Sequence, residues 1–290
     1  MGRRPDDHPD LFGDAAPPAA QDRADRALIE QLIAATRLYD TAPAARDLLD
    51  FVARLRSVAP FNAMLLHVQK PGITHVANAT DWATRFGRYP VRGARPLVIL
   101  RHYGPVDFVF DFQDTEGHPL PEDAFTFPTL GNVSDARFAD LIEYARRERF
   151  TVTDVDTGDA SAGWVRVTKR SDAPSGKHAY EIGLNRNHAR PTQLVTLAHE
   201  LGHVLLGHLG PDPGRRVPDR RGRDHALIEM EAESVAYLVA RRNGLTLRSG
   251  SYLASFGGDF SVVDWHAVMR AANAVETALG VSAHRLWEAG

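Results

Sequence analysis

The sequence predicts an α+β protein that consists of a short tail and two domains. Apolar residues recur at helical spacing near both ends of the chain, whereas apolar patterns typical of strands occur in two separate blocks. The 290 residues suffice for two cores, and 43% hydrophobic against 24% charged residues is the composition of a globular protein. We therefore expect a tail over residues 1–22, an N-terminal domain over 23–134 and a C-terminal domain over 135–290.

The N-terminal part is expected to begin with helices. Residues 1–22 are rich in Pro, Asp and Ala and lack periodicity, which is typical of a disordered tail. Amphipathic patterns then predict helices over residues 24–39, 44–58 and 62–69. The third helix stops before the Pro71-Gly72 pair, which marks a turn.

Two strands are expected after these helices. Residues 96–100 form a continuous apolar run, and residues 106–112 alternate between apolar and polar side chains. That alternation is typical of a sheet with one buried face, and residues 102–105 supply the turn between the two strands.

The C-terminal domain is expected to mix helices with a second group of strands. Amphipathic or apolar patterns predict helices, and Gly244 follows the third of them as a C-cap. The predicted helices are 135–149, 194–206, 224–244 and 262–279. The predicted strands are 151–156, 164–169 and 179–185.

The helix at 194–206 carries the pattern H-E-x-x-H inside an apolar run. His199 and His203 are four residues apart, so both imidazoles lie on one helix face and can bind one metal ion. Zinc suits these donors and keeps an open position for water in catalytic sites, where Glu200 would serve as general base. Three ionisable groups buried without a partner would be unfavourable, which favours a metal site over a chance match on an amphipathic helix.

The third zinc ligand is expected on the helix at 224–244, where three glutamates occur in five positions. Glu229 and Glu233 share one face, so one can bind the metal while the other orients a histidine. We assign Glu229 as the ligand and Glu233 as the orienting carboxylate, and the reverse assignment stays open. Glu231 points away from both and suits a solvated acidic first turn.

These motifs resemble those of the ImmA/IrrE-type zinc metallopeptidases. H-E-L-G-H followed by E-x-E-A-E-x-x-A carries the resemblance, which covers about residues 180–260. It implies a minimal zincin-like fold of the gluzincin type (HExxH followed by Glu), with one Zn²⁺ per chain and Glu229 as third ligand. It also implies limited regulatory cleavage of a protein such as a helix-turn-helix repressor.

The metzincin pattern is excluded, because Leu206 and Leu209 stand where it requires Gly and a third His. His208 is then interpreted as a helix-end histidine that the helix dipole favours. Residues 211–223, which hold five arginines and three prolines, are interpreted as a solvated loop, with a rim of the cleft as the alternative.

Substrate binding is expected to involve the strand before the zinc helix. In zinc peptidases of this architecture that strand often lines the cleft, so we expect residues 180–185 to be an edge strand that pairs with an extended peptide. The alternative is a fully paired inner strand. Tyr252, Tyr237 and His225 are candidate donors to the developing oxyanion, although each is more often structural.

A second function class comes from residues 82–101, where arginines lie among aromatic residues. Charges for phosphates and flat rings for bases are what a single-stranded nucleic acid requires, and a solvated loop is the alternative. The candidate contacts are Trp82, Arg85, Arg88, Arg92 and Arg95. Short motifs between Phe61 and Gly117, among them P-L-V-I-L and F-D-x-x-x-T-E-G, resemble the N-terminal, single-stranded DNA-binding domain of ArdC-like antirestriction proteins. This resemblance implies a DNA-binding protein whose zinc domain is structural or accessory.

Composition and net charge indicate the kind of partner and the cellular compartment of the protein. The net charge of −3 argues against a wholly basic nucleic-acid binder. Cysteine is absent, no apolar run approaches the length of a membrane span, and the N-terminus lacks an apolar signal segment. We therefore expect a cytoplasmic protein without a membrane partner.

Overall fold

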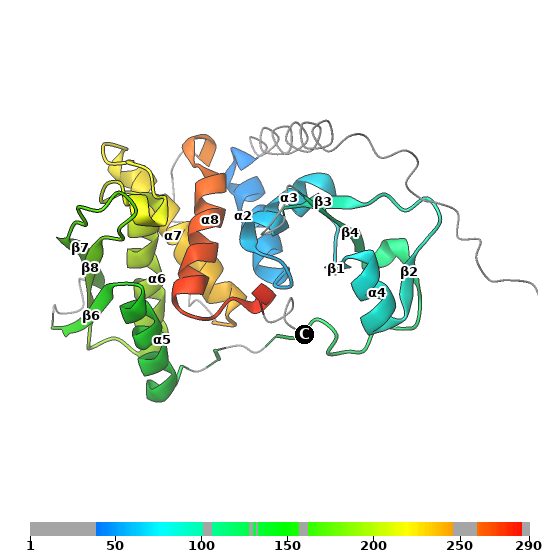
Figure 1. Ribbon diagram of the computed structural model, residues 1–290, viewed down its shortest axis with the longest axis horizontal. Coiled ribbons are helices and arrows are strands. Elements are labelled where there is room, and N and C mark those ends of the chain that lie inside the picture. The colour runs from blue at the N-terminus through cyan, green and yellow to red at the C-terminus, as the bar shows by residue number, and fades with distance from the viewer. Residues whose placement is uncertain are drawn as a thin grey trace, which may run out of the picture.

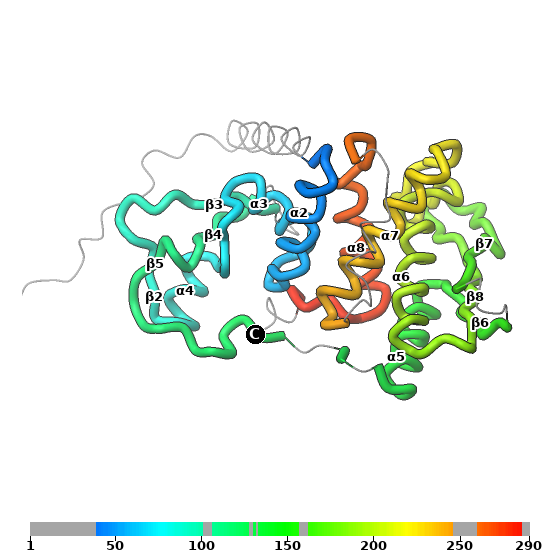
Figure 2. The backbone as a smooth tube through the Cα atoms, turned by 180° about the vertical axis from the view of Figure 1, so that it is seen from behind, coloured from blue at the N-terminus to red at the C-terminus, as the bar shows by residue number. Residues whose placement is uncertain are grey.

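The computed structural model describes residues 39–100, 106–127, 130–131, 133–156, 162–245 and 260–285. The expected tail, most of the first predicted helix and Tyr252 lie outside these residues. A bundle of helices occupies the middle of the molecule, with one β-sheet at one end and a second β unit, made of shorter strands, at the other (Figures 1 and 2). The predicted α+β class is confirmed.

The N-terminal helices begin near the residues that the sequence indicates. Helix α2 (Ala42–Arg54) follows Thr41, whose hydroxyl accepts a hydrogen bond from the amide of Ala44. Helix α3 (Pro60–Gln69) begins with a proline, whose missing N–H is not needed in a first helical turn.

The predicted strand pair is present and belongs to a small β unit. Strand β3 (Leu97–Ile99) pairs antiparallel with β4 (Asp107–Asp111), which also pairs with β1 (Val76–Ala77). Three short elements complete the unit, and the two strands among them have three residues each, too few to show a period. These additions are helix α4 (Ala79–Phe86) and the antiparallel ribbon of β2 (Arg88–Pro90) and β5 (Thr115–Gly117).

The second sheet lies beside helix α5 (Asp135–Arg147) and has the order β6-β8-β7. Strands β6 (Phe150–Val155) and β7 (Gly163–Lys169) form its edges. Strand β8 (Ala179–Asn185) pairs parallel with β6 and antiparallel with β7. The expectation that residues 180–185 form an edge strand is therefore wrong, because both sides of that strand are already paired within the sheet.

Helices α6 (Arg190–Leu206) and α7 (His225–Arg242) pack closely against each other. Gly202 lies at this contact, where a Cβ atom would be 3.4 Å from the Cα atom of Ala232. Helix α6 also packs against the sheet, where Thr196 lies next to Gly163 of β7. The two helices that carry the predicted ligands are thus held at a fixed distance.

Helix α8 (Trp265–Ala278) joins α7 to the N-terminal helices. Arg242 of α7 is fully buried and forms an ion pair of 3.0 Å with Glu276 of α8. Its guanidinium also donates hydrogen bonds to backbone carbonyl groups in the last turn of α2 and in the segment that follows this helix. Those carbonyl groups belong to Val52, Leu55 and Val58. One cluster of buried hydrophobic residues extends from Tyr39 to Leu279, so the boundary expected between residues 134 and 135 runs across a shared core.

The loop between α6 and α7 is partly exposed, as its interpretation as a solvated segment requires, but it is also fixed to the sheet. The carboxylate of Asp212 is buried and accepts hydrogen bonds from the Tyr180 hydroxyl at 3.1 Å and the His178 amide at 3.3 Å. Arg215 lies over the Phe150 ring with its guanidinium 4.7 Å from the ring centre. Arginines of this loop therefore form specific ion pairs and ring contacts.

Gly207 caps helix α6 and starts this loop, and its replacement by alanine is expected to destabilise the protein. Its φ is +86°, and a Cβ atom would lie 2.1 Å from the Pro218 carbonyl oxygen. Gly222 has a similar φ of +93° with no atom within 4 Å, so it provides a matched control. We expect urea unfolding to show a loss of about 1 kcal/mol for Gly222→Ala and about 3 kcal/mol for Gly207→Ala. Equal losses would mean that the contact with Pro218 does not restrain the loop.

Candidate metal centre

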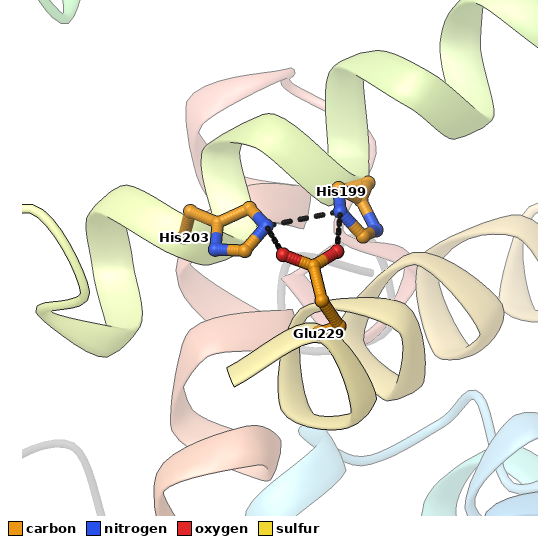
Figure 3. A group of neighbouring side chains, drawn as sticks. All are labelled: His199, His203 and Glu229. Atoms are coloured by element: carbon orange, nitrogen blue, oxygen red, sulfur yellow. Dashed lines mark hydrogen bonds and ion pairs between the residues drawn. The ribbon is translucent and has the colours of Figure 1, made fainter. Parts of the chain in front are cut away.

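Three side chains from two helices converge on one point (Figure 3). His199 and His203 project from α6 with their Nε2 atoms 3.0 Å apart. Glu229 projects from α7, and its two oxygens lie 3.4 Å from Nε2 of His199 and 3.5 Å from Nε2 of His203. The structure thus brings the three expected ligands together.

The spacing of these donor atoms fits a zinc ion. Ligands bound tetrahedrally at about 2.0–2.1 Å from zinc are separated from one another by roughly 3.3 Å. The three distances of 3.0 to 3.5 Å among His199, His203 and Glu229 agree with that value. The Glu229 side chain is 40% exposed, so a small ion and a substrate can reach the site from solvent.

Glu233 lies on the outer side of His199, as expected for an orienting carboxylate. Its Oε2 atom is 2.8 Å from Nδ1 of His199. A carboxylate accepts hydrogen bonds, so Nδ1 of His199 carries a proton and Nε2, which faces Glu229, is the nitrogen left to bind a metal. The geometry therefore favours Glu229 over Glu233 as the third ligand.

The site attracts positive charge. Burial lowers the pKa of His199, but hydrogen bonds to Glu229 and Glu233 outweigh it and raise that pKa to about 9. Burial and the charge of His199 lower the pKa of His203 to about 4. The hydrogen bond from His199 lowers the pKa of Glu229. In the metal-free protein the extra proton on His199 therefore balances part of the negative charge of Glu229 and Glu233. A divalent cation would balance more of that charge.

Glu200 follows His199 on α6 and is buried. Burial and the charge of Glu229 raise its pKa to about 7, against the lowering effect of His199. Among the described residues no side chain or backbone group hydrogen-bonds to its carboxylate. A carboxylate with a raised pKa and no competing partner is suited to take a proton from a water molecule near neutral pH.

Two buried residues beside the site contact each other, which the sequence did not indicate. The Glu231 side chain is completely buried, which corrects its interpretation as a solvated acid of the first turn. It lies 3.1 Å from Nε2 of His208, whose other nitrogen is 3.0 Å from Nδ1 of His203. His208 lies just after the end of α6, as expected of a helix-end histidine, and its side chain is buried. The only sign of this contact in the sequence is that His208 and Glu231 are further ionisable residues close to the metal-binding motifs.

The candidate oxyanion donors fall in different places. His225 is highly exposed in the first turn of α7, with Nδ1 3.8 Å from Oε1 of Glu229. Tyr237 lies about 12 Å beyond Glu229 along the same helix and donates a hydrogen bond to Asp50 at 2.5 Å. Tyr252 is outside the described residues. Of the three candidates, His225 is therefore the one that the structure places beside the metal ligands.

The predicted nucleic-acid contacts are only partly exposed. Trp82 is completely buried and donates a hydrogen bond to the Phe110 carbonyl, so its ring is not available to stack on a base. Arg88 is also buried, and its guanidinium binds the hydroxyl and carbonyl of Thr115. Packing of α4 and β2 removes both residues from the expected surface. The exposed members of the stretch are Arg85, Tyr89, Arg92 and Arg95.

Comparisons with known proteins agree with this geometry. The family model of the IrrE N-terminal-like domain (Peptidase_M78) matches residues 153–239, which contain both histidines and Glu229. The expected resemblance to the ImmA/IrrE type is thereby confirmed over these residues. A search of the curated proteins found no match.

Two solved structures are similar to this chain, and both have 17% sequence identity to it. They are the Mn(II)-bound and metal-free crystal structures of the antirestriction protein ArdC from plasmid R388. The Mn(II)-bound structure has a TM-score of 0.43, over 89% of this chain and 96% of that chain. The metal-free structure has a TM-score of 0.35, over 76% and 81%.

The described residues include no helix that is both long enough and apolar enough to span a membrane.

Proposed function

We propose that this protein is a zinc-dependent endopeptidase of the gluzincin type. The observation that carries the proposal is the convergence of His199, His203 and Glu229, with Glu200 beside them, within a domain that matches a peptidase family. When zinc is bound by these three side chains, it supplies Lewis-acid activation of a water molecule.

Each side chain of the site then has a separate role. Glu200 accepts the proton of the attacking water as general base and later delivers a proton to the leaving amine. Glu233 holds the His199 ring with its Nε2 lone pair toward the site. His225 is placed to donate a hydrogen bond to the developing oxyanion from the exposed side.

The substrate is proposed to be an extended segment of a protein. Since β8 is an inner strand, the free edge nearest α6 belongs to β7, where Gly163 lies against Thr196. Thr196 precedes the ligand His199 by almost one helical turn, so a peptide paired with β7 would pass close to the metal ligands. Limited cleavage of a helix-turn-helix repressor remains the proposed biological reaction.

The test is cleavage of a mixed peptide library and of candidate repressors by protein that has been dialysed against a chelator and then reloaded with zinc. We expect internal peptide bonds to be cut only by the reloaded protein, because the proposed mechanism depends on zinc to activate water. Equal cleavage by both preparations would indicate a contaminating protease. Absence of cleavage by fully loaded protein would count against the peptidase.

Single-stranded DNA binding is the second candidate function. The supporting observation is that Tyr89 is 59% exposed and lies near the exposed residues Arg92 and Arg95. Titration of a labelled single strand is then expected to show binding that weakens with salt and weakens further in the Arg92→Ala/Arg95→Ala variant. Equal binding by the variant, or none by the wild type, would dismiss this candidate.

A further inference from the structure

A chain of buried hydrogen bonds leaves the metal centre on the far side of His203. Nδ1 of His203 is 3.0 Å from Nδ1 of His208, and Nε2 of His208 is 3.1 Å from Oε2 of Glu231. The side chains of His208 and Glu231 are 2% and 0% exposed. The chain therefore runs from a metal ligand to a carboxylate without contact with solvent.

The carboxylate sets the direction of every proton in this chain. A carboxylate only accepts hydrogen bonds, so Nε2 of His208 carries a proton and donates it to Glu231. When the His208 ring carries this single proton, its Nδ1 is an acceptor, and Nδ1 of His203 is the donor to it. The lone pair of His203 is left on Nε2, which is the nitrogen that faces Glu229.

The orientation of the Glu231 carboxylate is itself fixed by donors on its other oxygen. Oε1 accepts hydrogen bonds from Arg220 at 2.7 Å, Arg223 at 2.9 Å and the Asp264 amide at 3.1 Å. The two arginines belong to the loop before α7, and Asp264 is the N-cap of α8. Only Oε2 remains for His208, so the two oxygens of Glu231 are not interchangeable.

We propose that Glu231 and His208 are positioning residues that hold His203 in the tautomer able to bind the metal. They do for His203, through one intervening ring, what Glu233 does directly for His199. This inference rests on the proposed zinc site. It assigns a role in the metal centre to a third histidine and a fourth glutamate that contact no metal-binding nitrogen.

The decisive variant is Glu231→Gln. It keeps the shape of the side chain but exchanges donor and acceptor in each hydrogen bond from residue 231 to His203. The three donors at Oε1 hold the amide oxygen there, so the NH₂ group faces His208 and donates to its Nε2. His208 must then carry its proton on Nδ1 and donate to His203, whose own proton moves to Nε2. Zinc can bind Nε2 of His203 only if the proton leaves that nitrogen. The proton would then lie on Nδ1 of His203, where it would face the proton on Nδ1 of His208, and two hydrogen-bond donors would be in contact. We expect zinc affinity, measured by chelator competition, to fall about 10- to 100-fold.

Glu233→Gln is the matched control, because it also removes one negative charge next to a histidine ligand. Among the described residues His199 is the partner of the Glu233 carboxylate, and no second donor fixes its orientation. The side-chain amide introduced by this substitution can therefore turn its oxygen to His199 and preserve the tautomer. We expect a loss of affinity several times smaller than that of Glu231→Gln, and an equal or larger loss would contradict the inference.

A double variant separates proton direction from the structural role of Glu231 toward the arginines. In His208→Asn the amide oxygen accepts from Nδ1 of His203, while the shorter side chain does not connect to residue 231. Adding Glu231→Gln to His208→Asn should change zinc affinity by less than about twofold. If Glu231 merely supports the loop through Arg220 and Arg223, the full loss will persist in the His208→Asn background and the inference is wrong.

Nitrogen-15 spectra of the imidazole rings in metal-free protein test the inference independently of zinc. The proton of His203 should be on Nδ1 in the wild type and on Nε2 in Glu231→Gln. An unchanged tautomer would overturn the inference even if affinity falls. Failure of the wild type to bind zinc would overturn the proposed peptidase instead, and the tautomer would still decide the role of Glu231.

Discussion

Glu200→Gln is expected to bind zinc normally and to cleave its substrate about a thousandfold more slowly than the wild type. Gln has the shape of Glu but does not take up a proton near neutral pH, so the variant lacks a general base. The three proposed ligands are His199, His203 and Glu229, and the substitution touches none of them. Initial rates of peptide cleavage and the zinc content of the same samples provide the measurement.

A surface variant of the same type serves as control. Glu143→Gln on α5 changes an exposed glutamate that pairs with Arg146 and Arg147, and its cleavage rate should equal that of the wild type. Retained cleavage by Glu200→Gln at full zinc occupancy would exclude Glu200 as the base. If the variant instead holds substrate without cutting it, it can be used to capture the natural substrate from cells.

Glu229→Ala is expected to lower zinc affinity at least about a hundredfold, which exceeds the effect expected for an orienting residue. The Glu229 carboxylate spans both Nε2 atoms of the histidine pair, and no other carboxylate among the described residues lies on that side of both rings. Elemental mass spectrometry after dialysis should find about one zinc per wild-type chain and much less in the variant. The side chain is 40% exposed, so the fold should survive, and circular dichroism will verify this.

Glu233→Ala is the informative companion, because Glu233 was the rival ligand from the sequence. It should reduce zinc affinity less than Glu229→Ala, since its oxygen contacts Nδ1 of His199 rather than the nitrogen that faces the site. The reverse order of losses would exchange the two roles. A folded wild-type protein that binds no zinc even after resupply would remove the peptidase and leave DNA binding as the first candidate.

The sequence alone was sufficient for features that depend on a single helix or strand. The spacing of His199 and His203 places both rings on one face because an α-helix repeats every 3.6 residues. The same periodicity pairs Glu229 with Glu233 and separates them from Glu231. The long helices, the β3/β4 pair and the three strands β6, β7 and β8 were predicted for the same reason, since each shows a helical, alternating or continuous apolar pattern.

Only the tertiary structure decided which of these faces meet. It placed Glu229 opposite two imidazoles and Glu233 behind one of them, and it buried Glu231 against His208. It also made β8 an inner strand and placed Trp82 in the core. The physical reason is that periodicity describes how side chains are arranged around one element, whereas pairing and packing between elements depend on contacts between residues far apart in the chain.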